Sequence, residues 1–141
     1  THQVDLERVL KLADLQPGQT VYELGCGDGR LLIEIAKRTS AKQLVGYEIS
    51  LLFYLIARLR SLCHKNIQIR FQDFWHADLR EANLVYVFLT PRIHERLRHK
   101  LEHELKPGAK VICYTWPIEG WTPIHIDRVT ARTLYVYIRP A

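Results

Sequence analysis

Three glycines separated by single residues form the part of the sequence best suited to holding a ligand. The run Gly25-Cys26-Gly27-Asp28-Gly29 directly follows the apolar stretch 20–24. Glycines let the backbone turn sharply, and they allow a bound molecule to approach the main chain where side chains would block it. Arg30 occupies the position at which the dinucleotide pattern G-x-G-x-x-G has its third glycine. The loop therefore predicts a ligand at the end of a strand, and its spacing weakens the case for a pyrophosphate.

Carboxylates near the loop narrow the chemistry of that ligand. Glu23 precedes the loop, where it would repel a phosphate but could receive the ammonium of a methionine moiety, directly or through water. Glu48 ends the next apolar stretch, about 20 residues further on, where an acid can accept hydrogen bonds from both ribose hydroxyls. Asp73 and Phe74 offer a carboxylate for an adenine amino group and a ring for its face. The alternatives are a solvated charge for Glu23 and a helix-capping acid beside Ser50 for Glu48.

Alternating strands and helices must place these residues at one edge of a sheet. We predict helices over residues 6–15, 30–38, 51–62 and 92–105, and strands over 20–24, 43–48, 67–71, 83–89 and 109–116. Two more strands, 124–129 and 133–138, are separated only by a turn and predict an antiparallel hairpin at one edge. We interpret this order as five strand-then-helix units and a hairpin. The expected fold is α/β, with a doubly wound, mostly parallel sheet in three layers, and residues 1–141 are expected to form one domain.

Composition agrees with a globular chain. Apolar residues make up 48% of the 141 positions and charged residues 25%, enough for a core without disulfides or metal. The cysteines, Cys26, Cys63 and Cys113, are far apart, and the histidines show no ligand spacing beyond His99 and His103, which we expect to be a surface pair. We therefore expect no metal site and a reducing, cytoplasmic setting. The net charge of +5 favours an acidic partner, such as nucleic acid, an anionic membrane surface or an acidic protein patch.

The apolar run 51–56 exceeds what a one-sided amphipathic helix requires. We expect these six residues to pack between the sheet and the leading helix. The alternative is an exposed apolar face that could meet a membrane protein or a membrane surface.

The motifs described so far occur in an order that resembles the class I S-adenosylmethionine-dependent methyltransferases. The segments that carry the resemblance are 21–30, 46–48, 72–74 and 105–108, so it covers nearly the whole chain. It implies a Rossmann-like class I methyltransferase fold, with S-adenosyl-L-methionine as cofactor and S-adenosyl-L-homocysteine as product. The residues it implies for cofactor binding are Glu23, Gly25, Cys26, Gly27, Gly29, Glu48, Ile49, Asp73 and Phe74.

Three later segments look like one family of protein lysine methyltransferases. These are 86–91, 100–108 and 114–123, of which the last has the most specific spacing of aromatic residues and prolines. The family includes a broad-specificity archaeal enzyme and the mitochondrial enzymes that modify the ATP synthase c-subunit and the adenine nucleotide translocase. The resemblance implies a protein substrate bearing a lysine, with a membrane-associated substrate and a location peripheral to a membrane as open alternatives.

Lysine methylation would require the residues around the substrate amine, here called the mouth of the site, to favour its neutral form. A lysine amine, with a pKa near 10.4, must be neutral to attack, so a partly dry aromatic wall is useful. Tyr114, Trp116 and Trp121 could provide that wall, and Thr90, with Pro91 beside it, could orient the amine. Packing in the core or in turns is the alternative for the aromatic residues. No general base is assigned, because the sulfonium donor is reactive and alignment can supply much of the rate.

Two other functions remain open from the sequence. An RNA or small-molecule methyltransferase is compatible with the basic charge. However, Phe88-Leu89-Thr90-Pro91 replaces the acid or Asn, Pro-Pro and aromatic expected of base-amine methylation. A binding module that holds S-adenosylmethionine without catalysis would bind the cofactor but show no turnover.

Overall fold

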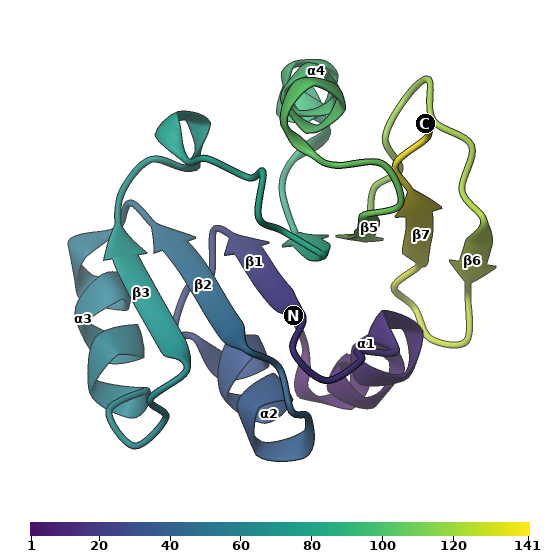
Figure 1. Cartoon of the computed structure of the whole chain (residues 1–141). Coiled ribbons are helices and arrows are strands. Elements are labelled where there is room, and N and C mark those ends of the chain that lie inside the picture. Colours follow the sequence, from purple (N-terminus) through teal and green to yellow (C-terminus); the bar gives the residue numbers. More distant parts are fainter.

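A seven-stranded sheet crosses the molecule in the computed structural model, which describes residues 1–141 (Figure 1). Its strands lie in the order β3-β2-β1-β4-β5-β7-β6. The bounds are β1 Thr20–Leu24, β2 Gln43–Glu48, β3 Ile67–Phe71, β4 Leu84–Val87, β5 Lys110–Tyr114, β6 His125–Asp127 and β7 Leu134–Ile138. Strands β1 to β5 pair in parallel, whereas β7 is antiparallel to both β5 and β6. The predicted mostly parallel sheet with a terminal antiparallel hairpin is confirmed.

Helices cover both faces of the sheet, which confirms the three layers (Figure 1). The helices are α1 Leu6–Ala13, α2 Arg30–Arg38, α3 Leu51–Arg60 and α4 His94–Glu104, with 3-10 turns at Gln3–Asp5, Phe74–His76 and Pro91–Ile93. Side chains of α1, α2 and α3 share one buried cluster, and those of α4 belong to the other. None of the helices combines the length and the apolar character needed to span a bilayer.

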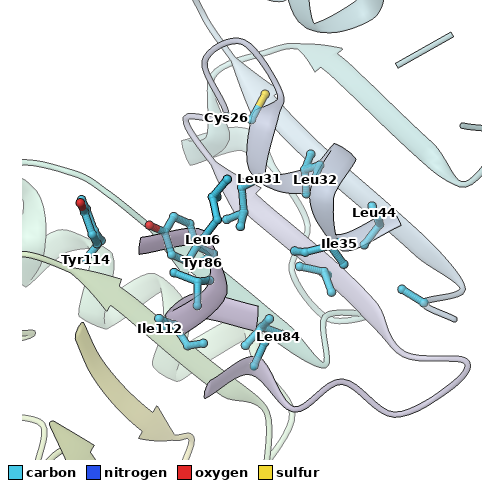
Figure 2. Close-up of a cluster of buried hydrophobic side chains, with 14 of the residues drawn as sticks. Leu6, Cys26, Leu31, Leu32, Ile35, Leu44, Leu84, Tyr86, Ile112 and Tyr114 are labelled. Atoms are coloured by element: carbon cyan, nitrogen blue, oxygen red, sulfur yellow. The ribbon is translucent and has the colours of Figure 1, made fainter. Parts of the chain in front are cut away.

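The central strands and the helices account for the two cores. Every residue of β1 and β4 is buried, as expected for strands covered on both faces. Figure 2 shows the cluster beneath α1 and α2, whose labelled members are Leu6, Cys26, Leu31, Leu32, Ile35, Leu44, Leu84, Tyr86, Ile112 and Tyr114. On the other face, Leu97, Leu101 and Leu105 from α4 and its end pack on the sheet. These layers fix the carboxyl ends of the strands relative to one another.

The prediction of five strand-then-helix units is wrong in two units. Strand β3 is followed only by the 3-10 turn Phe74–His76, and β5 by an irregular segment that contains Pro117, Gly120 and Pro123. Both segments lack helical periodicity, and prolines remove helix hydrogen bonds. The fourth and fifth strands also end earlier than predicted, at Val87 and Tyr114.

The expected burial of the apolar run in α3 is wrong, and the exposed alternative is the correct one. Ala57 is the only buried residue of the helix, whereas Leu51, Leu52, Phe53 and Leu55 are exposed. Helix α3 lies beside β3, at the edge of the sheet, so the sheet can cover only one side of a helix that is apolar on several sides.

Candidate active site

The glycine-rich loop lies where the order of the sheet reverses, between β1 and β4. Ligands bind in open α/β sheets at such a switch point, outside the carboxyl ends of the strands. Gly27 has φ +54°, and a Cβ built there would meet no atom within 4 Å. At Gly29, with φ +76°, a Cβ would lie 3.2 Å from Cβ of Ala57. Gly27 therefore leaves open space for a ligand, and Gly29 lets α2 and α3 approach each other.

Four of the five amide groups of the loop, all except that of Asp28, are already paired within the protein. Gly25 N and Cys26 N both donate to the Tyr47 carbonyl at 2.9 Å, and Gly29 N donates to the Cys26 carbonyl at 3.0 Å. Gly27 N donates to the Glu48 carboxylate at 2.8 Å. A phosphate cradle needs several free N–H groups directed at the anion. This loop therefore suits a ligand without phosphate, in agreement with the weak match to the dinucleotide pattern.

Glu23 supplies a buried acceptor that has no partner within the protein. Its side chain is only 6% exposed, and Oε2 has no hydrogen bond. Burial raises the pKa of this carboxyl to about 8, against the opposing effect of the N-terminal ammonium. A buried unpaired carboxyl is costly unless a ligand satisfies it, and an ammonium group is the natural complement. The alternative of a solvated charge is excluded, and the methionine moiety of S-adenosylmethionine fits.

Glu48 holds the loop and still has acceptor capacity for a ligand. Its Oε2 accepts from Gly27 N and its Oε1 from Ser50 N, both at 2.8 Å. Each carboxylate oxygen has a second lone pair, so ribose hydroxyls can still donate to it. Ser50 caps α3, since its hydroxyl accepts from Phe53 N. Glu48 thus combines a structural role at the start of α3 with the predicted position for a ribose.

Ile49, Asp73 and Phe74 follow two neighbouring parallel strands. Glu48 is paired with Phe71 in the register of β2 and β3, so the residues beyond them lie at the same sheet edge. Ile49 is exposed, and one oxygen of Asp73 accepts from Trp75 N at 3.0 Å, which begins the 3-10 turn. Phe74 is half-buried against Trp75. This arrangement provides an apolar side chain, a carboxylate and a ring for an adenine.

Cys26 has a packing role rather than a chemical one. It is buried, and burial raises the pKa of its thiol. A Cβ at Gly46 would lie 2.7 Å from Sγ of Cys26, so the absence of a side chain on β2 makes room for this thiol.

The loops after β4 and β5 border a cleft of about 260 Å³. Pro91, His94, Trp116, Pro117 and Glu119 line it. Thr90 is exposed beside Pro91, and Trp116 is 44% exposed. Phe88, also exposed, adds an aromatic ring at the end of β4. The cleft is therefore bordered by Pro91 and Trp116, two of the residues predicted to contact the substrate.

His94 joins the two sides of the cleft and was missed by the sequence analysis. Its ring is 3% exposed, with Nδ1 2.8 Å from the Pro117 carbonyl and Nε2 3.2 Å from the Leu89 carbonyl. A ring nitrogen that carries a proton can donate to the carbonyl it faces, and the ring lies between the two loops. The sequence did show a histidine three residues after Pro91, at the start of a predicted helix. It did not show that this histidine contacts carbonyls 5 and 23 residues away in the chain.

Tyr114 and Trp121, two of the predicted substrate residues, form side-chain hydrogen bonds within the protein, the first buried and the second half-buried. The Tyr114 hydroxyl donates to Asp5 at 2.6 Å, and burial, followed by this bond, raises its pKa to about 12. Trp121 donates from Nε1 to Glu102 at 2.9 Å and packs on Tyr137. Neither residue lines the cleft. Their contact with a substrate stays a prediction, and the structure gives both a packing role behind the mouth.

A buried ionic network holds Tyr114 and the leading helix against the terminal hairpin. Asp5, 1% exposed, also accepts from Arg8 at 2.6 Å and from Thr130 at 2.9 Å. Arg8 in turn pairs with Asp127 at 2.9 Å. Although burial acts to raise the pKa of Asp5, these hydrogen bonds lower it on balance. The wall behind the cleft is therefore fixed by contacts between residues more than a hundred positions apart.

Comparisons with known proteins agree with this site. The family model described as the ANTKMT methyltransferase domain matches residues 23–125. A protein-lysine N-methyltransferase of Saccharolobus islandicus (strain REY15A) is 35% identical over 142 residues, covering 94% of this chain and 87% of that protein. The adenine nucleotide translocase lysine N-methyltransferase of Mus musculus is 34% identical, covering 89% of this chain but 58% of its own length.

One solved structure has nearly the same fold over its whole length. It is the crystal structure of an RNA methyltransferase from Salinibacter ruber in complex with S-adenosyl-L-homocysteine. The TM-score is 0.94 at 30% identity, and the match covers 99% of this chain and 93% of that chain. The predicted Rossmann-like class I fold and S-adenosylmethionine as the cofactor are thereby confirmed.

Proposed function

Since the chain belongs to the ANTKMT methyltransferase domain family, we propose that it transfers the S-methyl group of S-adenosylmethionine to a lysine side chain of a protein. One observation carries this proposal. The unpartnered buried carboxyl of Glu23 and the cleft beside Trp116 both lie at the carboxyl ends of the parallel strands. The first is complementary to the ammonium of the cofactor. The second accommodates a long aliphatic side chain with an amine at its tip.

S-adenosylmethionine supplies a methyl carbon activated by its positively charged sulfur. The lysine nitrogen bonds to that carbon while the carbon–sulfur bond breaks, the sulfur keeps the electron pair, and the nitrogen releases a proton to water. The mouth residues favour this step by disfavouring the ammonium form of lysine, because Pro91, Trp116 and Pro117 give the cleft apolar walls. His94 faces main-chain carbonyls with both ring nitrogens, so we assign it a positioning role and name no general base.

RNA methylation is a second candidate because a relative of known structure is named an RNA methyltransferase. The distribution of charge favours the lysine proposal instead. The residues that line the cleft include no lysine or arginine. Helix α4 beside it carries Arg96, Arg98 and Lys100 but also three glutamates. An RNA substrate requires cations that follow its phosphates, and a balanced helix offers little net attraction.

The test is incubation of the purified chain with methyl-labelled S-adenosylmethionine and a cell extract separated into protein, RNA and small-molecule fractions. We expect label on protein lysines, and we expect Glu23→Gln to reduce this label when the cofactor is limiting. Glu81→Gln, an exposed acid outside the site, is the matched control and should label as the wild type does. Label confined to RNA or to small molecules would overturn the proposal. Cofactor binding by calorimetry without any labelled product would instead identify a non-catalytic binding module.

A further inference from the structure

Exposed apolar side chains concentrate on and around α3. Of fourteen large hydrophobic residues that are exposed in the chain, eight lie between positions 49 and 71. They are Ile49, Leu51, Leu52, Phe53, Leu55, Leu59, Leu62 and Phe71, and we call them the α3 face. Their exposed fractions range from 48% for Phe53 to 71% for Leu59. Soluble proteins seldom expose so many neighbouring apolar side chains without a partner for them.

The same segment carries only positive charge. Residues 49–72 contain Arg58, Arg60, Lys65 and Arg70 but no aspartate or glutamate. This short stretch therefore accounts for four of the five net positive charges of the chain. Arg60 pairs with Asp28 at 2.5 Å, whereas Arg58 and Lys65 form no ion pair. The α3 face is thus apolar at its centre and bordered by cations.

The positions around the helix show how the two kinds of side chain are arranged. At about 100° per residue, Leu51, Leu55, Leu59 and Leu52 fall within an arc of roughly 100°. Arg58 lies about 20° outside one edge of this arc, and Arg60 about 80° outside the other. Ala57, the only buried residue of the helix, lies nearly opposite the arc. The leucines therefore point directly away from the sheet, between two arginines.

We propose that the α3 face is a docking surface for a bilayer that contains anionic lipids. A leucine-rich arc bordered by arginines is the pattern of helices that lie in the membrane interface. The apolar side chains enter the acyl boundary, while arginine and lysine extend to the anionic headgroups. A second copy of the chain is a poor occupant, because its α3 face would bring Arg58 and Lys65, which form no ion pair, against the same unpaired cations.

Docking in this way brings the bilayer to the edge of the cofactor site. Leu51 begins α3 three residues after Glu48, and exposed Ile49 belongs both to the α3 face and to the predicted cofactor residues. The enzyme would lie on the membrane surface with the carboxyl edge of its sheet near the headgroups. Docking through the α3 face does not depend on which atom receives the methyl group.

The test is sedimentation of the full chain with vesicles of phosphatidylcholine alone or of phosphatidylcholine mixed with phosphatidylglycerol, at low and high salt. We expect binding to the mixed vesicles that weakens as salt is added. Leu55→Ser with Leu59→Ser should lower the partition coefficient by about tenfold or more, because two leucines leave the interface. Ile124→Ser with Val129→Ser is the matched control, since both residues are exposed but lie outside the α3 face.

Both double variants replace exposed side chains, and unchanged affinity for S-adenosylmethionine shows that each is folded. Absence of binding to the mixed vesicles would overturn the proposal, as would binding that the Leu55 and Leu59 substitutions leave unchanged. Self-association of the chain that these substitutions abolish, without vesicle binding, would also overturn it and would identify the α3 face as a contact between copies.

Discussion

Two groups of loops meet at the carboxyl edge of the sheet, and they are held by different kinds of contact. The loop after β1 is tied to β2 beside it through the Tyr47 carbonyl and the Glu48 carboxylate. The loops after β4 and β5 are joined by the ring of His94 and supported by side chains from distant parts of the chain. The loop after β1 thus depends on a carbonyl and a carboxylate of the adjacent strand, whereas the loops after β4 and β5 depend on side chains from distant parts of the chain.

Because the two groups of loops are held independently, a single substitution can change cofactor affinity without changing turnover, or turnover without changing cofactor affinity. Changes at the loop after β1 should alter cofactor affinity, because that loop and Glu23 are predicted to hold the cofactor. Changes at the mouth should alter turnover while leaving cofactor affinity intact, because none of the residues that line the cleft belongs to the predicted cofactor set. The following substitutions test the separation, beginning with the largest expected effect.

Replacing Glu23 by glutamine should lower the affinity for S-adenosylmethionine by about 10- to 100-fold, since a charged hydrogen bond to the ammonium is lost. The same change should raise the melting temperature of the protein without cofactor at alkaline pH by about 2–6 °C, because a buried ionised carboxyl is removed. Calorimetry and thermal unfolding measure the two effects. Unchanged affinity would show that Glu23 does not contact the cofactor.

Replacing Trp116 by alanine should lower kcat/KM for methylation by about 10- to 30-fold through loss of the apolar wall, with unchanged cofactor affinity. Ile124→Ala removes an exposed apolar side chain elsewhere and serves as the control. A loss of cofactor affinity in the Trp116 variant would contradict the separation of the two loop groups.

Replacing His94 by alanine should lower kcat by about tenfold, because the two sides of the cleft lose their connection. Asparagine can place a donor near the position of Nδ1 and keep the bond to the Pro117 carbonyl, so His94→Asn should recover part of the loss. Steady-state kinetics distinguish the two variants. Equal losses in both would argue against a positioning role through that carbonyl.

The pH dependence of cofactor binding should show the smallest effect. Burial raises the pKa of Glu23 to about 8, above its ordinary value of 4.5, so the carboxyl is mainly protonated at neutral pH. Pairing with an ammonium requires the carboxylate, and affinity should therefore increase by about several-fold as pH rises from about 7 to about 8. Glu23→Gln should remove this dependence, as measured by calorimetry at each pH.

The stability of the protein without cofactor should change in the opposite direction. A pKa raised by folding stabilises the folded state fully below 4.5, and this contribution is lost as pH rises through about 8. Thermal unfolding of the wild type should therefore show a decline over this range that is smaller in Glu23→Gln. If the melting temperatures of the wild type and of Glu23→Gln changed equally over this range, the raised pKa of Glu23 would be contradicted.

The cofactor part of the site could be predicted because its geometry follows from strand order and local spacing. Gly27 follows β1 and Glu48 ends the adjacent parallel strand β2, and the alternation of strands and helices along the chain indicates that these ends meet. The glycine conformations are likewise a property of the loop itself. Sequence patterns therefore carry most of the information on this half of the site.

The mouth and α3 could not be predicted in the same way. The contacts of Tyr114 with Asp5 and of His94 with Pro117 join residues far apart in the chain, and no periodicity indicates them. How much of α3 is buried depends on how much of the helix the edge of the sheet can cover. The apolar content of the helix does not reveal this. The sequence indicated that α3 is apolar but did not decide which surface it meets.

The most direct test of the central claim identifies the atom that receives the methyl group. Proteins labelled by the wild type with methyl-labelled cofactor would be hydrolysed to amino acids and separated, with Trp116→Ala assayed in parallel at saturating cofactor. We expect the label to elute as methylated lysine and the Trp116 variant to produce much less of it. Label on any other amino acid, or on RNA alone, would contradict the account.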